Sequence, residues 1–294
     1  MTRAGIVTVV GKPNAGKSTF LNRVVGQKLS IVSAKPQSTR DRIVGILTED
    51  DTQMIVFDTP GLLNPRYALH RAMRGTALDA LADADVIIYL ADAAAGPAPS
   101  LVEAAELTSP PKAPVITAYN KLDTIDAQQR ARLADATPGA RFISALTGEG
   151  VGDLVGEARV ALPESPFLYD AEDVSTQTLR FFAAELVRES ALEQLDEEVP
   201  YSLACEIEEF RETRTPVYIR AVLYVERETQ KHILIGAKGA RIKEIGRSAR
   251  VKIEALIEQK VYLDLWVKVL PNWRKNSGAL ARFGYRIPEE KKSR

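Results

Sequence analysis

The sequence predicts two successive α/β domains, and the first of them contains a mostly parallel sheet. Over residues 1–166, short apolar runs rich in β-branched residues alternate with helical segments, which is typical of a parallel sheet covered by helices on both faces. Pro163 and Pro166 interrupt this alternation, and a second series of helices and strands follows. We therefore expect domains over residues 1–166 and 179–294, joined by a linker over residues 167–178. A chain of 294 residues is long enough to form two cores.

The first domain is expected to contain a sheet with one antiparallel edge strand. Residues 50–52 form a short turn between two strands, which is typical of an antiparallel pair. The expected strands cover residues 5–10, 42–49, 53–58, 85–91, 114–120 and 141–143. The expected helices follow Gly16 and cover residues 67–82, 99–107, 127–134 and 151–162.

The second domain is expected to begin with a helix, because apolar residues recur at helical spacing over residues 175–195. Residues 201–210 and 215–225 alternate between apolar and polar and therefore predict a pair of strands. Trp266 and Trp273 are expected to pack in the core and at its edge. The remaining expected elements are helices near 232–235, over 240–248 and within 251–259, a strand over 261–270 and a basic tail from residue 273.

A glycine-rich segment between the first strand and the first helix has the pattern G-x-x-x-x-G-K-[ST] of a phosphate-binding loop. In that position the backbone amides of residues 14–19 and the helix N-terminus face one anion together. The ammonium group of Lys17 supplies positive charge to the β- and γ-phosphates, and the Ser18 hydroxyl can ligate Mg²⁺. The residues expected to line this phosphate site are Gly11, Lys12, Pro13, Asn14, Ala15, Gly16, Lys17, Ser18 and Thr19.

Two further motifs follow in the order that a guanine-nucleotide site requires. Asp58 ends an apolar strand, where its carboxylate can hold Mg²⁺ through water, and Gly61 can donate its N–H to a γ-phosphate.

Asp123 can accept hydrogen bonds from two ring N–H groups of guanine, which adenine does not present. Asn120 and Lys121 are expected to brace the base-binding loop. A backbone N–H at the segment 144–145 can lie near guanine O6. The other expected nucleotide contacts are Thr59, Pro60, Leu62, Ser144 and Ala145. Together the three motifs predict a GTPase.

Composition excludes several other classes of protein. The single cysteine, Cys205, allows no internal disulfide, suits a reducing cytoplasm and is expected to be a small buried hydrophobe. The most apolar stretch, residues 86–91, is too short to span a bilayer, and we expect no signal peptide before the first strand. Two histidines in the chain offer no support for a His-based catalytic site or a metal cluster.

The C-terminal part of the chain is basic, although the formal net charge of the whole is zero. Residues 227–294 contain 17 Lys and Arg against 7 Asp and Glu, a net charge of +10 that residues 1–226 balance with −10. Such asymmetry indicates contact with nucleic acid or with a membrane surface. The alternative is a solvated surface that happens to be rich in Lys and Arg.

The basic segment contains a G-x-x-G loop between two expected helices. This is the arrangement of KH domains, whose loop clamps the backbone of single-stranded RNA. The loop glycines let phosphates approach, and the cations neutralise them. Ile235, Ile242 and Ile245 are expected to form part of an apolar groove for bases. The alternative is a connection between two helices that binds no ligand. The expected RNA contacts are Ile235, Gly236, Ala237, Lys238, Gly239, Arg241 and Lys243.

With these motifs the chain resembles the Era family of GTPases over nearly its whole length. The resemblance implies a Ras-type P-loop GTPase domain followed by a type II KH domain, with GTP or GDP and Mg²⁺ as ligands. It also implies that Thr39 completes the Mg²⁺ coordination in the GTP state, beside Ser18 and Asp58. Ser38 stands where members of the family usually carry Thr. The matching segments are residues 11–19, 36–40, 58–61, 120–123, 198–202, 207–210, 235–246 and 261–269.

The resemblance further implies the partners of the protein. It implies binding to small-subunit ribosomal RNA near the 3′ end of that RNA, and a role in assembly of the small ribosomal subunit. It also implies a loose peripheral association of some members with the inner face of the cell membrane. We expect a cytoplasmic monomer. A tRNA-modification or membrane-signalling GTPase is a rival that the KH-like region argues against.

Leu62 constrains the mechanism, because Ras-like enzymes carry a water-orienting glutamine at that position. Without this glutamine or an evident arginine finger, intrinsic hydrolysis should be slow and should depend on Lys17, Thr39, Gly61 and Asn14. The resemblance implies that related GTPases with this loop asparagine recruit a K⁺ that mimics the finger; the alternative is that Asn14 only braces the loop. The second hypothesis for the whole protein is a nucleotide-sensing, RNA-binding scaffold with negligible hydrolysis.

Overall fold

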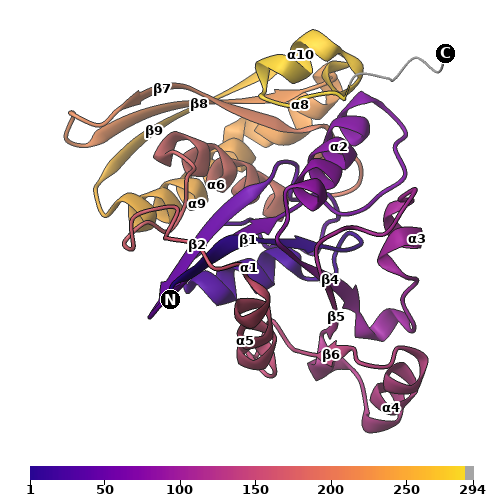
Figure 1. The fold of residues 1–294 in the computed structure, drawn as a ribbon. Helices are drawn as coiled ribbons and strands as arrows, with labels where there is room; N and C mark the ends of the chain where they lie inside the picture. Colours follow the sequence, from indigo (N-terminus) through magenta and orange to yellow (C-terminus); the bar gives the residue numbers. More distant parts are fainter. Residues whose placement is uncertain (289–294) are drawn as a thin grey trace, which may run out of the picture. The chain divides into compact units, whose positions relative to one another are not determined.

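The computed structural model describes residues 1–288, which divide into two compact units (Figure 1). The first unit comprises residues 1–66 and 70–176, and the second comprises residues 67–69 and the chain from residue 177. The end of the basic tail, which supplies Lys291, Lys292 and Arg294 to the charge count, lies outside the described residues.

A six-stranded sheet in the order β2-β3-β1-β4-β5-β6 forms the centre of the first unit. β2 pairs antiparallel with β3 and the other neighbouring pairs are parallel, which confirms the predicted edge strand. The strands β1, β3, β4 and β5 therefore end at the same edge of the sheet, where α/β proteins bind their ligands. The strands are β1 (Arg3–Val10), β2 (Ile43–Glu49), β3 (Thr52–Asp58), β4 (Val86–Asp92), β5 (Val115–Asn120) and β6 (Arg141–Phe142).

Helices cover both faces of this sheet, as predicted. Successive side chains of a strand point to opposite faces, yet Ile87 and Ile88 of β4 are both fully buried. Ile87 belongs to a cluster that includes Ala77 and Leu101, which lie on two different helices. The helices are α1 (Lys17–Val25), α2 (Ala68–Ala82), α3 (Leu101–Ala105), α4 (Ala127–Ala136) and α5 (Val151–Ala161), with short 3₁₀ turns at Ala93–Ala95 and Leu122–Thr124.

The segment over residues 167–176 runs along the sheet of the first unit. The buried amide of Gln53 in β3 accepts hydrogen bonds from the backbone N–H groups of Leu168 and Tyr169 and donates one to the Tyr169 carbonyl. Further along, the Ile46 N–H donates to the Val174 carbonyl at 2.9 Å. The expected linker is thus tied to β2 and β3 over most of its length.

The second unit contains a three-stranded sheet in the order β7-β8-β9. β7 is antiparallel to β8, and β8 is parallel to β9, so a crossover connects the last two strands. Two helices and the G-x-x-G loop form that crossover, which is the α/β unit that the sequence predicts. The elements are α6 (Leu179–Gln194), α7 (Val199–Ser202), β7 (Ala204–Arg211), β8 (Val217–Val225), α8 (Glu228–Ile235), a 3₁₀ turn (Ala237–Gly239), α9 (Ala240–Ile257), β9 (Val261–Val269), a 3₁₀ turn (Trp273–Lys275) and α10 (Ser277–Arg282).

Three details of the second unit differ from the sequence prediction. The expected helices over 240–248 and 251–259 are one continuous helix, because Ile245, Ala249 and Ile253 form a single buried stripe along α9. Residues 199–202 form a helical turn with Pro200 near its start, rather than the beginning of a strand. The tail folds into α10, whose first turn is capped by the Asn276 side chain.

The core of the second unit lies between α6, α9 and the sheet. Its fully buried members include Val187 of α6, Ile219 of β8 and Ile245 of α9. Trp273 is also fully buried, with its indole N–H donating to the Ser202 carbonyl at 2.8 Å, whereas Trp266 on β9 is 53 % exposed. The core assignment is therefore right for Trp273, and Trp266 lies at the surface.

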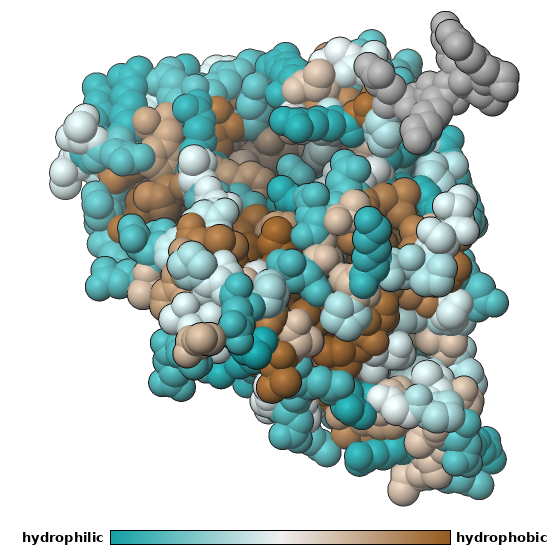
Figure 2. All heavy atoms as spheres, in the orientation of Figure 1, coloured by the Kyte–Doolittle hydropathy of each residue, from teal (hydrophilic) through white to brown (hydrophobic). Residues whose placement is uncertain are grey.

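A helix must be both long and apolar to cross a bilayer. Among residues 1–288, no helix is both long enough and apolar enough to do so. Figure 2 shows hydrophilic and hydrophobic residues interspersed over the face in view.

Candidate nucleotide site and candidate RNA-binding loop

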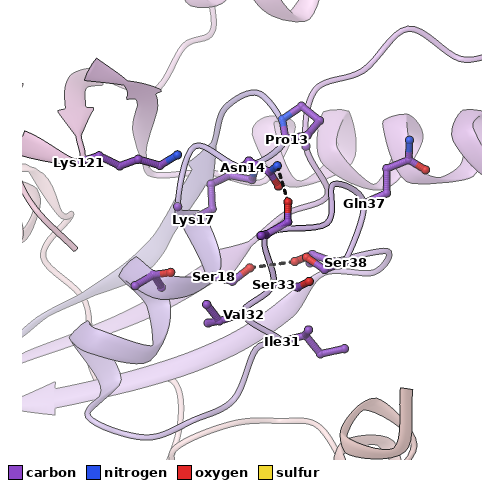
Figure 3. A pocket seen from close by; sticks show the side chains of 15 residues that line it. Pro13, Asn14, Lys17, Ser18, Ile31, Val32, Ser33, Gln37, Ser38 and Lys121 are labelled. Atoms are coloured by element: carbon purple, nitrogen blue, oxygen red, sulfur yellow. Dashed lines mark hydrogen bonds between the residues drawn. The ribbon is translucent and has the colours of Figure 1, made fainter. Parts of the chain in front are cut away.

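The loop after β1 surrounds a pocket of about 340 Å³ at the carboxyl edge of the large sheet (Figure 3). Its glycines are required by close contacts. A Cβ atom at Gly11 would lie 2.1 Å from the Leu90 carbonyl oxygen, and one at Gly16 would lie 2.1 Å from Asn120 Nδ2. Gly16 also has a φ of 91°, which side-chain-bearing residues rarely adopt. The loop can therefore hold its amides close to an anion only with glycine at these two positions.

The Lys17 ammonium group is folded back onto the loop. It donates to the carbonyl oxygens of Gly11 at 3.2 Å and Lys12 at 3.0 Å. Burial lowers the pKa of Lys17 to about 8, and the Asp58 carboxylate offsets part of that effect. A buried cation whose ammonium hydrogen bonds go to carbonyl oxygens is suited to an anionic ligand, because phosphate oxygens compensate its lost hydration better.

Three hydroxyl groups converge on the carboxylate of Asp58. Oδ2 of Asp58 accepts from Ser18 Oγ at 2.7 Å and Ser30 Oγ at 2.9 Å, and Thr39 Oγ1 lies 3.5 Å away. Ser18 Oγ and Thr39 Oγ1 lie 2.9 Å apart. Burial raises the pKa of Asp58, while Lys17 and the hydroxyl groups lower it.

This set of oxygen donors fits Mg²⁺. The other carboxylate oxygen of Asp58, Oδ1, is buried and has no hydrogen-bond partner among the described residues. Such an orphaned oxygen needs a donor, a water or a cation. Mg²⁺ takes oxygen ligands and keeps waters and phosphates in its shell, so Ser18, Thr39 and Asp58 suit it together with a nucleotide. The Ser30 hydroxyl was not predicted, because it lies in a segment without periodicity.

The expected base-binding residues lie together at the ends of β5 and β6. The Asn120 side chain donates to the Ala15 carbonyl and accepts from the Ala145 N–H, each at 2.8 Å, so it ties the two loops together as expected. Asp123 is exposed and accepts from the Ser144 hydroxyl. The Ser144 hydroxyl thus orients the Asp123 carboxylate, which can accept hydrogen bonds from a guanine ring. Lys121 forms an ion pair at 2.6 Å with Asp92, a partner that was not predicted.

Not every expected nucleotide contact turns its side chain to the pocket: the buried Thr59 hydroxyl donates to the Val9 carbonyl at 2.9 Å, and Leu62 is a second case. It is 5 % exposed and packs with Tyr89 and Leu101 in the core. Its N–H donates to the Gly11 carbonyl at 2.9 Å and is therefore engaged within the protein. The preceding Gly61 does line the pocket, and a Cβ atom there would lie 2.7 Å from Pro13 N. Leu62 therefore offers no side chain to the nucleotide, because an apolar residue at this position packs into the core.

The loop between α1 and β2 forms the opposite wall of the pocket, and most of it was not predicted. The Asn14 side chain donates to the Ala34 carbonyl in this loop at 3.0 Å (Figure 3). Thr39 was expected there. The lining residues that sequence reasoning missed are Ile31, Val32, Ser33, Ala34, Gln37 and Ser38.

The G-x-x-G loop of the second unit has a backbone that exposes its cations. Gly236, Lys238 and Gly239 have φ values of 73°, 51° and 79°. A Cβ atom at Gly236 would lie 2.8 Å from Arg241 Cβ. Lys238 and Lys243 are exposed, so both can meet phosphates that approach from solvent.

Two residues near this loop have other surroundings than expected. Ile245 is fully buried in the core and cannot line a groove for bases, whereas Ile235 and Ile242 are partly exposed. The Arg241 guanidinium donates to the Ile233 carbonyl at 2.8 Å and so holds the end of α8 next to the loop. Arg241 therefore supports the loop as well as adding charge.

Comparisons with known proteins agree with this geometry. Residues 6–121 match the family described as 50S ribosome-binding GTPase, and residues 198–274 match the KH domain family. The chain is 42 % identical to the GTPase Era of Carboxydothermus hydrogenoformans, over 96 % of this chain and 98 % of that protein. It is also 42 % identical to the GTPase Era of Thermotoga petrophila, over 93 % of this chain and 94 % of that protein.

Solved structures agree as well. Era in complex with MgGDPNP and nucleotides 1506–1542 of 16S ribosomal RNA is 38 % identical, with a TM-score of 0.93 over 98 % of this chain and all of that one. A variant of Aquifex aeolicus Era bound to GDP and AlF₄⁻ is 38 % identical, with a TM-score of 0.92 over 97 % of this chain. The identities extend through both domains, and the chain belongs to the Era family of GTPases.

Proposed function

We propose that this protein is a GTP-hydrolysing switch that binds small-subunit ribosomal RNA and acts in assembly of the small ribosomal subunit. The observation that carries this proposal is one chain that contains both a braced guanine-nucleotide site and an exposed, cationic KH loop. A solved relative that matches 98 % of the chain was captured with Mg²⁺, a GTP analogue and the 3′ segment of 16S ribosomal RNA. The combination supports a switch whose nucleotide state changes how RNA is held.

In this mechanism the residues of the first unit bind and orient the triphosphate. The loop amides and the N-terminus of α1 receive the α- and β-phosphates, and Lys17 exchanges its carbonyl partners for the β- and γ-phosphates. Ser18, Thr39 and Asp58 would hold Mg²⁺, which would supply positive charge to the phosphates. Asp123 accepts from the guanine ring, and Gly61 presents its N–H to the γ-phosphate. Leu62 stands where Ras-like enzymes carry a water-orienting glutamine, so we expect intrinsic hydrolysis to be slow.

The role of Asn14 separates two versions of the mechanism. In one, Asn14 positions a K⁺ beside the phosphates; in the other, it only braces the loop, as its hydrogen bond to the Ala34 carbonyl supports. If K⁺ is positioned by Asn14, replacing K⁺ by Na⁺ slows hydrolysis by the wild type much more than by Asn14→Ala. Equal rates in the two salts identify the bracing role.

Single-turnover GTP hydrolysis, measured with and without RNA of nucleotides 1506–1542 of 16S ribosomal RNA, tests the proposal. We expect slow hydrolysis alone and a change in rate when the RNA is bound. Binding of both ligands with no hydrolysis in either condition would favour the alternative of a nucleotide-sensing scaffold. Sequencing of RNA crosslinked to the protein in cells should recover the 3′ end of the small-subunit RNA.

The cellular setting is part of the same proposal. We propose a cytoplasmic monomer with peripheral association at the inner face of the cell membrane, which the basic segment over residues 227–294 supports. Light scattering should give the mass of one chain. Co-flotation with anionic vesicles that is lost at high salt would support the membrane association. If the protein does not co-float even at low salt, the proposed membrane association is wrong.

A further inference from the structure

One histidine connects the two loops that enclose the phosphate end of the pocket. The Arg66 N–H, just before α2, donates to Nδ1 of His70 at 3.3 Å. Nε2 of the same ring lies 3.0 Å from Oε1 of Gln37. Because Nδ1 accepts a hydrogen bond, the neutral ring carries its proton on Nε2 and donates it to Gln37.

The two partners of the ring come from two different loops, one of which lines the nucleotide pocket. Gln37 lies in the loop between α1 and β2 and lines the nucleotide pocket (Figure 3). Arg66 belongs to the loop that follows Gly61, and His70 lies in the first turn of α2. His70 is only 5 % exposed, so water competes little for its hydrogen bonds.

The position of Gln37 matters because its backbone is unusual and because Thr39, one of the candidate Mg²⁺ ligands, follows two residues later. Gln37 has a φ of 64°, a conformation that a residue other than glycine keeps only where its surroundings determine it. Two residues later, Thr39 Oγ1 lies 2.9 Å from Ser18 Oγ. A contact that fixes Gln37 therefore also restricts where the Thr39 hydroxyl can lie.

We propose that His70 is a positioning residue for the triphosphate state, because it holds Gln37 and thereby keeps Thr39 beside Ser18 and Asp58. The inference rests on the GTP-binding function proposed above. GDP needs the glycine-rich loop and the base-binding residues, whereas a triphosphate also needs the loop that carries Thr39. The hydrogen bond to Gln37 therefore contributes to binding of the triphosphate and not of GDP.

A double-mutant cycle with Gln37→Ala, His70→Ala and the double variant tests this inference. Dissociation constants for GDPNP and for GDP, both with Mg²⁺, are measured for each protein. One hydrogen bond makes about a fivefold difference in affinity. We expect each single variant to bind GDPNP about fivefold more weakly, the double variant to be no weaker than either, and GDP affinity to change less than twofold. The GTP hydrolysis rate should fall in parallel with GDPNP affinity.

Two further variants control for structural damage. Arg71→Ala changes the exposed neighbour of His70 on α2 and should bind both nucleotides as the wild type does. His70→Gln keeps a donor for Gln37 and should restore part of the GDPNP affinity. Gln37 is only half-buried, so Gln37→Ala remains informative if His70→Ala does not fold.

Three outcomes overturn the inference: unchanged GDPNP affinity, equal losses for GDPNP and GDP, or additive losses in the double variant. Failure of the wild type to bind GTP at all would instead overturn the proposed function.

Discussion

The nucleotide site and the G-x-x-G loop both contain glycines with positive φ, and Gly16 of the first and Gly239 of the second have opposite surroundings. A Cβ atom at Gly16 would lie 2.1 Å from Asn120, whereas one at Gly239 would meet nothing nearer than Ile242 at 4.0 Å. The cations differ in the same sense, since Lys17 is buried and bonded to the loop while Lys238 is exposed. The nucleotide site, which we call the cradle (residues 11–18, 58–61 and 120–123), is closely packed, and the G-x-x-G loop is an open, charged surface. Substitutions in the nucleotide site should therefore abolish nucleotide binding almost completely, whereas substitutions in the G-x-x-G loop should reduce RNA affinity by degrees.

The largest effect should follow from removing the buried cation of the cradle. Lys17→Ala should reduce GTP and GDP affinity by about 100-fold or more, because phosphates buried without their charge partner lose several kcal/mol. RNA affinity, measured without nucleotide, should not change. Titration calorimetry with GDP measures the loss, and Lys112→Ala, which removes an exposed lysine of the same unit, is the matched control. Nucleotide affinity within tenfold of the wild type would show that the loop amides suffice.

The two glycines themselves offer a matched pair. Gly16→Ala combines a backbone clash with an unfavourable φ and should lower the free energy of unfolding by about 2–3 kcal/mol and abolish GTP binding. Gly239→Ala introduces only the unfavourable φ, without a clash, and should lower the free energy of unfolding by about 1 kcal/mol. Urea denaturation of both variants measures the difference. Equal losses would mean that the open loop is as tightly constrained as the cradle.

Base choice should change at the exposed end of the cradle. Asp123→Asn should weaken GTP binding by tenfold or more, since charged hydrogen bonds are worth about 1.5–3 kcal/mol. The amide complements the exchanged donor and acceptor of xanthine, so affinity for xanthosine triphosphate should rise. Nucleotide competition assays compare the two. Tight ATP binding by the wild type would contradict the guanine assignment.

The smallest effect concerns the free thiol of the second unit. Cys205 is half-buried, and burial raises the pKa of its thiol, so we expect the thiol to be protonated at pH 8. Alkylation by iodoacetamide at pH 8 should be at least tenfold slower than in denatured protein, because the thiolate is the nucleophile. Equal rates in the two states would place the thiol at the open surface.

The motif residues of the nucleotide site were predicted better than the loop between α1 and β2 that lines its other side, for a physical reason. The residues of the three motifs have fixed spacing and contact one another through backbone geometry, so Lys17, Asp58 and Asn120 lie where expected. Ser30 and Gln37 lie in a loop without periodicity and reach the site only through the tertiary fold. The motif indicates that Leu62 follows Gly61 at the site but not where its side chain lies; that side chain is apolar and packs in the core, and its N–H donates to the Gly11 carbonyl.

In the second unit the strands were predicted and the helix boundaries were not. Alternation identified β8 and β9, but α9 was divided at residues 248–251, where no glycine or proline interrupts the chain. Its buried stripe of Ile245, Ala249 and Ile253 was readable from their spacing of four residues. Helix α10 is too short to show a period, and it is fixed by tertiary contacts such as buried Leu280.

The separation of cradle and open loop is tested most directly by one variant measured against both ligands. Ala237→Asp combined with Lys238→Asp puts negative charge where phosphates must approach, and Asp tolerates the left-handed backbone at residue 238. RNA affinity, measured by fluorescence anisotropy over a range of salt concentrations, should fall about tenfold or more, and its salt dependence should weaken because fewer counterions are released. GTP affinity should equal that of the wild type. Unchanged RNA binding would contradict the KH assignment of this loop and leave the basic segment to a membrane or protein surface.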